Sequence, residues 1–151
     1  MIVRLISPVR PYRGLRNTDA YGSGAFGASR GTRTHAGIDM AAQPGDEVVA
    51  PCDGRVVHIG VAYYGSLLGS LHIQGTGQFA DVRVKLLYVD ADDGLTGSVT
   101  KGQKIGIAQD VASYWHMKSP KSGTMRNHIH MELMMRCDPQ RFMRLPAEVA
   151  V

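Results

Sequence analysis

Cysteine, aromatic side chains and long apolar runs are all scarce in this chain of 151 residues. The two cysteines, Cys52 and Cys137, lie outside any C-x-x-C spacing, so we take both as structural or incidental thiols and leave their pairing open. No apolar run is long enough to form a membrane helix. The opening residues, Met1 to Pro8, are interrupted too early for a secretory signal. We therefore expect a protein without a transmembrane segment.

Charge and length narrow the classes further. The formal net charge of +4 and the isoelectric point near 9.3 suit attraction to anionic cell-wall or lipopolysaccharide surfaces. A merely solvated basic surface explains the charge equally well. No segment interleaves aromatic residues with Arg and Lys, so we expect no specific nucleic-acid partner. The length predicts a single domain, residues 1–151, that buries roughly 68–70% of its unfolded surface and that we expect to be monomeric.

Glycine and proline, 18 and 7 residues, interrupt short apolar runs along most of the chain, which predicts an all-β protein. Two segments, Pro11–Thr34 and Asp110–Asn127, are predicted to be loops that border a groove. Asp138 and Pro139 are typical of a helix N-cap and first position, which predicts a short closing helix from Pro139 to Leu145. The predicted strands cover residues 47–50, 54–59, 71–74, 82–88, 104–108 and 128–133.

The most informative feature is the pair His128 and His130. The run from His128 to Leu133 alternates polar and apolar residues, so on a strand both histidines point the same way. Far upstream, His35 and Asp39 are four residues apart, an even spacing that a strand would also place on one face. Two histidine nitrogens and one carboxylate oxygen fill three corners of a zinc tetrahedron and leave the fourth for water, as in catalytic zinc sites.

Several blocks follow one another along the chain in a recognisable order: Gly22–Arg30, His35–Asp39, Pro44–Pro51, Asp53–Val57, Gly97–Gly106, Asn127–Leu133 and Asp138–Phe142. Taken together, these blocks resemble the lysostaphin/LytM-type zinc metalloendopeptidases, which cut peptide bridges in bacterial peptidoglycan. The resemblance implies two packed antiparallel sheets of the duplicated hybrid motif type with a groove between their loops.

The same resemblance assigns roles to the candidate site residues. It implies one zinc ion held by His35, Asp39 and His130, with His128 as the general base. Glu132 continues the face of these histidines and is expected either to orient a ligand or simply to lie exposed.

The chain departs from the family at one position. The family carries a further histidine in a Tyr-x-His segment, where this sequence has Tyr88-Val89-Asp90. A branch resembling vertebrate leukocyte cell-derived chemotaxin, a zinc-binding relative without established peptidase activity, departs in the same way. On a strand Tyr88 and Asp90 would share a face, so our hypothesis is that the phenol of Tyr88 stabilises the oxyanion in place of the histidine. The alternative is that Tyr88 is a core aromatic and the site is slow or inert.

Three further residues lie in the second predicted loop. Tyr114 and Trp115 are expected to contact substrate, although they would serve equally well to pack the loop against the body. His116 is a weaker candidate for the groove. His58 and His72 follow ordinary strand alternation and are expected to be structural.

The sequence thus predicts a zinc endopeptidase that acts on peptidoglycan, with the D-alanine to diaminopimelate crosslink as the favoured bond. Without a signal segment, we expect a phage endolysin made in the host cytoplasm that acts at the cell wall after release. A mature exported enzyme is the alternative origin. The competing class is a zinc-holding binding module that has lost turnover.

Overall fold

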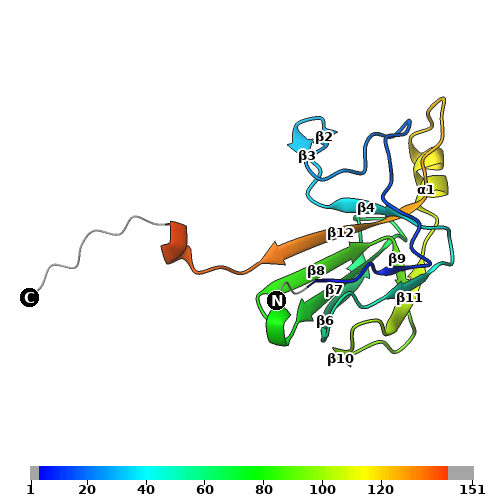
Figure 1. Cartoon of the computed structure of the whole chain (residues 1–151). Helices are drawn as coiled ribbons and strands as arrows, with labels where there is room; N and C mark the ends of the chain where they lie inside the picture. Colours follow the sequence, from blue (N-terminus) through cyan, green and yellow to red (C-terminus); the bar gives the residue numbers. More distant parts are fainter. Residues whose placement is uncertain (1–3, 143–151) are drawn as a thin grey trace, which may run out of the picture.

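The computed structural model describes residues 4–142 and shows antiparallel sheets with little helix (Figure 1). The predicted all-β architecture is confirmed. A six-stranded sheet has the strand order β10-β6-β7-β8-β12-β4, a four-stranded sheet has the order β1-β5-β11-β9, and β2 pairs with β3 alone. The strands are β1 (Val9–Arg10), β2 (Ser29–Arg30), β3 (Arg33–Thr34), β4 (Ile38–Ala41), β5 (Glu47–Val49), β6 (Gly54–Val61), β7 (Gly69–Gly75), β8 (Val82–Leu87), β9 (Val89–Ala91), β10 (Ser98–Val99), β11 (Lys104–Ala108) and β12 (His128–Met135).

The hydrophobic core lies between the two larger sheets. Side chains alternate between the two faces of a strand, and at alternate positions of β7, β8 and β12 they are apolar and buried. From the four-stranded sheet, Val9, Val48 and Ile105 close the other side of this core. The opposite face of the six-stranded sheet is therefore left for polar side chains. The residues that the six-stranded sheet contributes to the core are Leu71, Ile73, Val84, Leu86 and Ile129.

The second predicted loop, Asp110–Asn127, contains an α-helix instead of continuous loop, which corrects the prediction. Helix α1 runs from Val111 to Lys118, and the Asp110 carboxylate caps it by accepting a hydrogen bond from the Ser113 amide at 2.9 Å. Val111 is its only buried residue. Because a single buried residue gives no apolar periodicity, the sequence pattern did not predict the helix.

Two short 3₁₀ helices complete the described elements, η1 (Gly77–Phe79) and η2 (Pro139–Phe142). The closing helix was predicted from Pro139 to Leu145; its first four residues form η2, and the part beyond Phe142 lies outside the described residues. No helix in the described part of the chain is long and apolar enough to cross a membrane. Of the two cysteines, Cys52 is buried and Cys137 is exposed, and both are free thiols.

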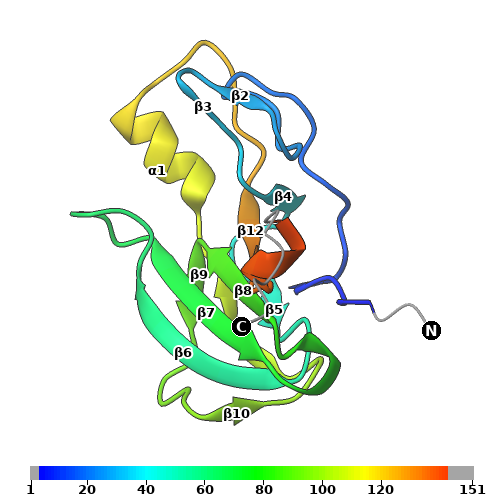
Figure 2. The ribbon, with the colours of Figure 1, turned by 90° about the vertical axis from the view of Figure 1, so that its left-hand side faces the viewer.

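The β2–β3 hairpin and α1 stand at the same end of the molecule, above β4 and the start of β12 (Figures 1 and 2). They form two projections on the polar side of the six-stranded sheet. The segment between them is where the candidate site lies.

Candidate metal centre

Strands β4 and β12 form the floor of the site. They pair antiparallel with Asp39 directly opposite His130, so these two side chains are neighbours on one face. On the other edge of β12, His130 is opposite Leu87 of β8, which fixes the register from both sides. His128 and His130 point to the same face, as the alternation predicted.

His35 reaches the site by a different route from the one that its spacing suggested. It lies in the connection between β3 and β4, outside either strand, so the argument from strand alternation was wrong for this residue. Its backbone is held instead by two hydrogen bonds with the segment before β2. The His35 amide donates to the carbonyl oxygen of Ala28, and the Gly27 amide donates to the carbonyl oxygen of His35.

The three predicted ligand residues converge. His35 Nε2 lies 2.8 Å from His130 Nδ1 and 3.1 Å from Asp39 Oδ1, and His130 Nδ1 lies 2.9 Å from the same carboxylate oxygen. Ligands of a tetrahedral zinc ion with bonds of 2.0–2.1 Å are about 3.3 Å apart, so the triangle is close to the size that zinc requires. All three side chains are buried.

The hydrogen bonds around the triangle decide which nitrogens carry protons. His35 Nδ1 lies 2.8 Å from the carbonyl oxygen of Ala25, which only accepts, so this nitrogen must be the donor. His130 Nε2 likewise lies 3.0 Å from the carboxylate of Glu132 and donates to it. In the neutral imidazoles the remaining nitrogens are therefore unprotonated and point at Asp39. Three electron-pair donors meet at one place, which is the arrangement that a divalent cation occupies.

Gly37 makes the close approach possible. A side-chain carbon at this position would collide with the carbonyl oxygen of Met131 and lie 2.9 Å from the imidazole of His130. The chain between His35 and Asp39 therefore passes directly against β12, and only glycine fits there.

A buried arginine supports Asp39 from behind. Arg16 donates to Asp39 Oδ2 at 2.9 Å and makes two hydrogen bonds with the carboxylate of Asp19, at 2.8 and 2.6 Å. Asp19 also accepts from the amides of Tyr21 and Arg126, so it joins its own segment to the segment before β12. Sequence reasoning missed Arg16 and Asp19, since nothing in their spacing indicates this contact.

The carboxylate of Asp39 is ionised under all ordinary conditions. Burial disfavours its charged form, but interactions with His130, His128 and His35 outweigh burial and lower its pKa to about 2.

His128 lies beside the three ligands without joining them. Its Nε2 is 3.6 Å from Asp39 Oδ2, and its Nδ1 donates to the carbonyl oxygen of Arg126 at 2.8 Å. Burial lowers the pKa of His128 to about 4, against the opposing effect of Asp39. At neutral pH its Nε2 is therefore an unprotonated base facing the site.

Tyr88 interrupts the strand that was predicted to run through it. Strand β8 ends at Leu87, and Tyr88 adopts a left-handed conformation with φ of 69°, which is rare for a residue other than glycine. Both of its backbone groups are hydrogen bonded, from its amide to Gly69 and from the Gln109 amide to its carbonyl. The structure holds this strained residue in place, a pattern that is common at functional sites.

The break sends Tyr88 and Asp90 in different directions, so the prediction that they share a strand face was wrong. Asp90 is exposed on β9, opposite Ile107, and does not line the site. The Tyr88 ring is buried against His128, with the ring centroids 5.4 Å apart. Its phenol forms a short hydrogen bond with the phenol of Tyr63, a residue that sequence reasoning missed. Burial and the neighbouring Tyr63 raise the pKa of Tyr88, so it remains a neutral hydroxyl.

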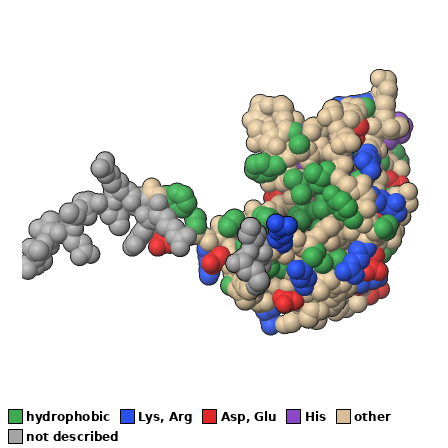
Figure 3. All heavy atoms as spheres, in the orientation of Figure 1, with side chains coloured by type: hydrophobic (Ala, Val, Ile, Leu, Met, Phe, Trp, Pro, Cys, Tyr) green, Lys and Arg blue, Asp and Glu red, His purple; other side chains and the backbone are tan. Residues whose placement is uncertain are grey.

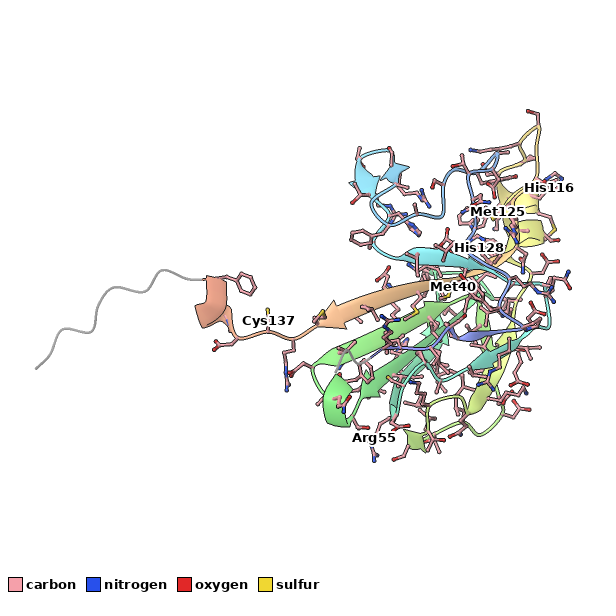
Figure 4. The ribbon with its side chains drawn as sticks, in the orientation of Figure 1. Met40, Arg55, His116, Met125, His128 and Cys137 are labelled. Carbon is pink, nitrogen blue, oxygen red and sulfur yellow. The ribbon has the colours of Figure 1, made fainter. Side chains whose placement is uncertain are left out.

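One pocket of about 550 Å³ is lined by the three ligand candidates together with His128, Tyr88 and Tyr63. Figure 3 shows the β2–β3 hairpin and the α1 segment as protrusions at the same end of the molecule. Trp115 lines the pocket, whereas Tyr114 does not and packs edge-on against Trp115 with ring centroids 5.4 Å apart. His116 is exposed on the outer side of α1, away from His128 (Figure 4), and takes no part in the pocket wall.

Glu132 and Lys85 continue the site along the sheet. Glu132 Oε2 accepts a hydrogen bond from Lys85 Nζ at 3.2 Å, while Glu132 Oε1 accepts the hydrogen bond from His130 Nε2. Of the two possibilities for Glu132, the structure shows the one in which it orients a histidine. His58 and His72 are opposite each other on β6 and β7, with rings 4.7 Å apart, and do not line the pocket.

The His–Asp–His cluster lies in a pocket on an antiparallel β fold, and its three donor atoms could hold a metal ion. The sequence pattern of peptidase family M23 matches residues 33–141, which include every ligand candidate. The chain belongs to peptidase family M23, and the predicted resemblance is confirmed. Family and site together indicate a metallopeptidase.

One relative and two solved structures resemble the chain over most of its length. The chain is 26% identical over 131 residues to mouse leukocyte cell-derived chemotaxin-2, covering 85% of this chain and 79% of that protein. The structure of Helicobacter pylori Csd3 matches with a TM-score of 0.57 at 24% identity; the match covers 95% of this chain but only 35% of Csd3. The catalytic domain of lysostaphin from Staphylococcus simulans matches with a TM-score of 0.52 at 21% identity, covering 82% of this chain and 90% of that domain.

Proposed function

We propose that the protein is a zinc-dependent endopeptidase that hydrolyses peptide crosslinks of bacterial peptidoglycan. The observation that carries this proposal is the convergence of His35, Asp39 and His130 in an open pocket, beside the unprotonated nitrogen of His128. When bound there, a zinc ion would polarise the scissile carbonyl and make a water molecule acidic near neutral pH. The remaining steps belong to side chains of this chain.

His128 is the general base in this proposal. Its Nε2 faces the site unprotonated, and its Nδ1 proton is fixed on the carbonyl oxygen of Arg126. The ring therefore accepts a proton from the attacking water at Nε2 and delivers the same proton to the leaving amine. General base catalysis of this kind contributes typically about 10²–10⁴-fold.

Tyr88 is the proposed donor to the oxyanion that forms on the scissile carbonyl. Its raised pKa keeps the hydroxyl proton in place, and its ring lies against His128 on the pocket wall. A preorganised neutral donor suits this task, because its dipole is already aligned when the negative charge develops.

Replacing Tyr88 with Phe tests the oxyanion role. We expect kcat to fall by about 10²-fold, as for the loss of one oxyanion donor elsewhere, with little change in KM. Tyr63→Phe is the matched control, because it removes the partner phenol and leaves the Tyr88 hydroxyl. An unchanged rate in Tyr88→Phe would rule the hydroxyl out.

The activity itself is tested by digesting purified peptidoglycan and measuring the soluble muropeptides released. The wild-type protein should release them, and both chelation of zinc and the variant His128→Ala should stop the release. Release that persists under both conditions would refute the metallopeptidase mechanism. Mass spectrometry of the products would show whether the D-alanine to diaminopimelate bond is cut, which we propose as the target. Zymography on walls of Gram-negative hosts tests the proposed setting of a phage endolysin.

A zinc-holding binding module is the second candidate. Among the described residues, His128 is the only histidine besides the ligand candidates that lines the pocket, and Asp90 has no part in it. A site that keeps its metal ligands but lacks a second catalytic histidine fits a protein that binds without turnover. Zinc-dependent binding to peptidoglycan without release of muropeptides would favour this candidate.

A further inference from the structure

The pocket walls carry an excess of positive charge. Its lining includes two acidic residues, Asp39 and Glu132, against five basic ones. Asp39 is engaged by Arg16 and Glu132 by Lys85, so the acidic groups are already paired inside the site. The basic lining residues are Arg16, Arg30, Arg33, Lys85 and Lys121.

On the rim, two of these cations have no close carboxylate among the described residues, and a third has one only at the edge of ion-pair distance. Arg33 and Lys121 are exposed, and neither makes an ion pair with the described residues. Lys121 Nζ lies over the ring of Tyr21, 5.2 Å from its centroid. Arg30 donates to the carbonyl oxygens of Ser23 and Ser29 and is 3.8 Å from Asp39, so its charge is only partly balanced.

Two of the cations face each other across the β2–β3 hairpin. Arg30 and Arg33 are direct cross-strand partners next to the turn. Like charges in directly opposite positions destabilise a hairpin, and this hairpin has only two residues in each strand. An anionic group bound between them would remove the repulsion.

The cations stand on both walls of the groove. Arg30 and Arg33 belong to the β2–β3 hairpin, and Lys121 belongs to the segment that follows α1. Figure 1 shows these two elements as separate projections on the same side of β4 and β12. An extended peptide that crosses the metal centre would therefore meet positive charge before and after the scissile bond.

We infer that the site selects peptides that carry free carboxylates on both sides of the cleaved bond, with Arg33 and Lys121 as specificity-determining residues. This inference rests on the proposed function and narrows its substrate. Stem peptides crosslinked through diaminopimelate carry such carboxylates on diaminopimelate and on the γ-linked glutamate. Bridges made of glycine carry none and would leave the rim cations without partners.

The test uses two synthetic crosslinked stem peptides that differ only in whether these carboxylates are free or amidated. Cleavage is measured as kcat/KM with the zinc-loaded wild-type protein. Binding without turnover is measured by calorimetry with His128→Ala. Arg33→Gln and Lys121→Gln are compared with Arg55→Gln, which makes the same charge change on β6, far from His128 (Figure 4).

We expect the free peptide to bind and react better than the amidated one. Each rim variant should weaken the free peptide by roughly two- to fivefold through a higher KM and leave the amidated peptide unchanged, because exposed ion pairs contribute modestly. The preference should shrink as salt is raised, while Arg55→Gln behaves as wild type. Equal use of both peptides, or equal losses on both in the rim variants, overturns the inference and leaves the proposed function standing. No cleavage and no binding of either peptide overturns both.

Discussion

The two faces of β12 are made by alternating residues of one strand and have opposite physical character. Ile129 and Met131 point into the core between the sheets, where they are 0% and 8% exposed. His128, His130 and Glu132 point to the other side and line the pocket. The core face requires only apolar side chains of the right volume, whereas the pocket face requires particular atoms in particular places.

The comparison shows why strand register matters so much in this protein. A shift of β12 by one residue would move the histidines into the core and Ile129 into the pocket. Pairing with β4 on one edge and with β8 on the other opposes such a shift. Stability and chemistry thus depend on the same backbone but on different side chains, and mutations should separate them.

The largest effect is expected on the pocket face. His130→Ala removes one of the three metal donors, and we expect activity to fall on the order of 10³-fold or more, because several kcal/mol of transition-state stabilisation depend on the metal. Zinc content after dialysis and the rate of muropeptide release measure this loss. His116→Ala, on the exposed side of α1, is the control and should leave both unchanged. A His130 variant that retains zinc and activity would contradict the assigned ligands.

The core face should respond in stability instead. Ile129→Ala leaves a cavity under the strand, and we expect a loss of about 3 kcal/mol in the free energy of unfolding. Urea unfolding of the zinc-loaded protein measures this loss, with Ile107→Ala on β11 as the partly exposed control. If Ile129→Ala lowers the free energy of zinc binding more than it lowers the free energy of unfolding, the proposed separation of the two faces fails.

Asp19, which lies behind the pocket, links the support of the site to the pH dependence of protein stability. Burial opposes its ionisation, but hydrogen bonds from Arg16, Arg126 and Tyr21 lower its pKa below the usual value. A lowered pKa stabilises the fold above the unfolded pKa of about 3.9, and this contribution disappears as the pH falls through the folded value.

The matching variant is Asp19→Asn. At pH 7 it should be less stable by roughly 2 kcal/mol, since buried Arg16 loses its main partner. Thermal unfolding between pH 3 and pH 7 should show the gap from wild type closing below about pH 4. A gap that stays constant with pH would contradict this account.

The smallest effect is expected at Glu132. Glu132→Gln replaces the carboxylate that accepts the hydrogen bond from His130 with a neutral amide, which is a weaker acceptor. We expect zinc affinity to fall by about tenfold. Competition with a coloured chelator measures the affinity. Lys85→Gln, which removes only the outer partner of Glu132, should have a smaller effect. A larger loss of zinc affinity in Lys85→Gln than in Glu132→Gln would contradict the role assigned to Glu132.

Much of the floor of the site followed from the sequence, because β12 and β4 obey simple alternation. His128, His130 and Asp39 lie where their positions on strands require. His35 also reaches the site, although the prediction that it lies on a strand was wrong. Its position is set by tertiary contacts of the β3–β4 connection and by the absence of a side chain at Gly37.

The walls did not follow from the sequence. Helix α1 has one buried residue and therefore no periodic signal, and Tyr63 reaches Tyr88 only through the folding of the segment between β6 and β7. Tyr88 itself breaks the strand through a backbone conformation that residue type does not indicate. Arg16 and Asp19 support the site across long sequence distances, which spacing cannot reveal.

The contact of Gly37 with β12 also has a consequence for which ions can enter. It brings the donors of His35, Asp39 and His130 close together, and they lie 2.8 to 3.1 Å apart. Calcium needs six to eight oxygen ligands at 2.3–2.6 Å, so both the nitrogen-rich donor set and the narrow spacing discriminate against it. Calcium-rich surroundings should therefore leave this centre available to the smaller transition ions.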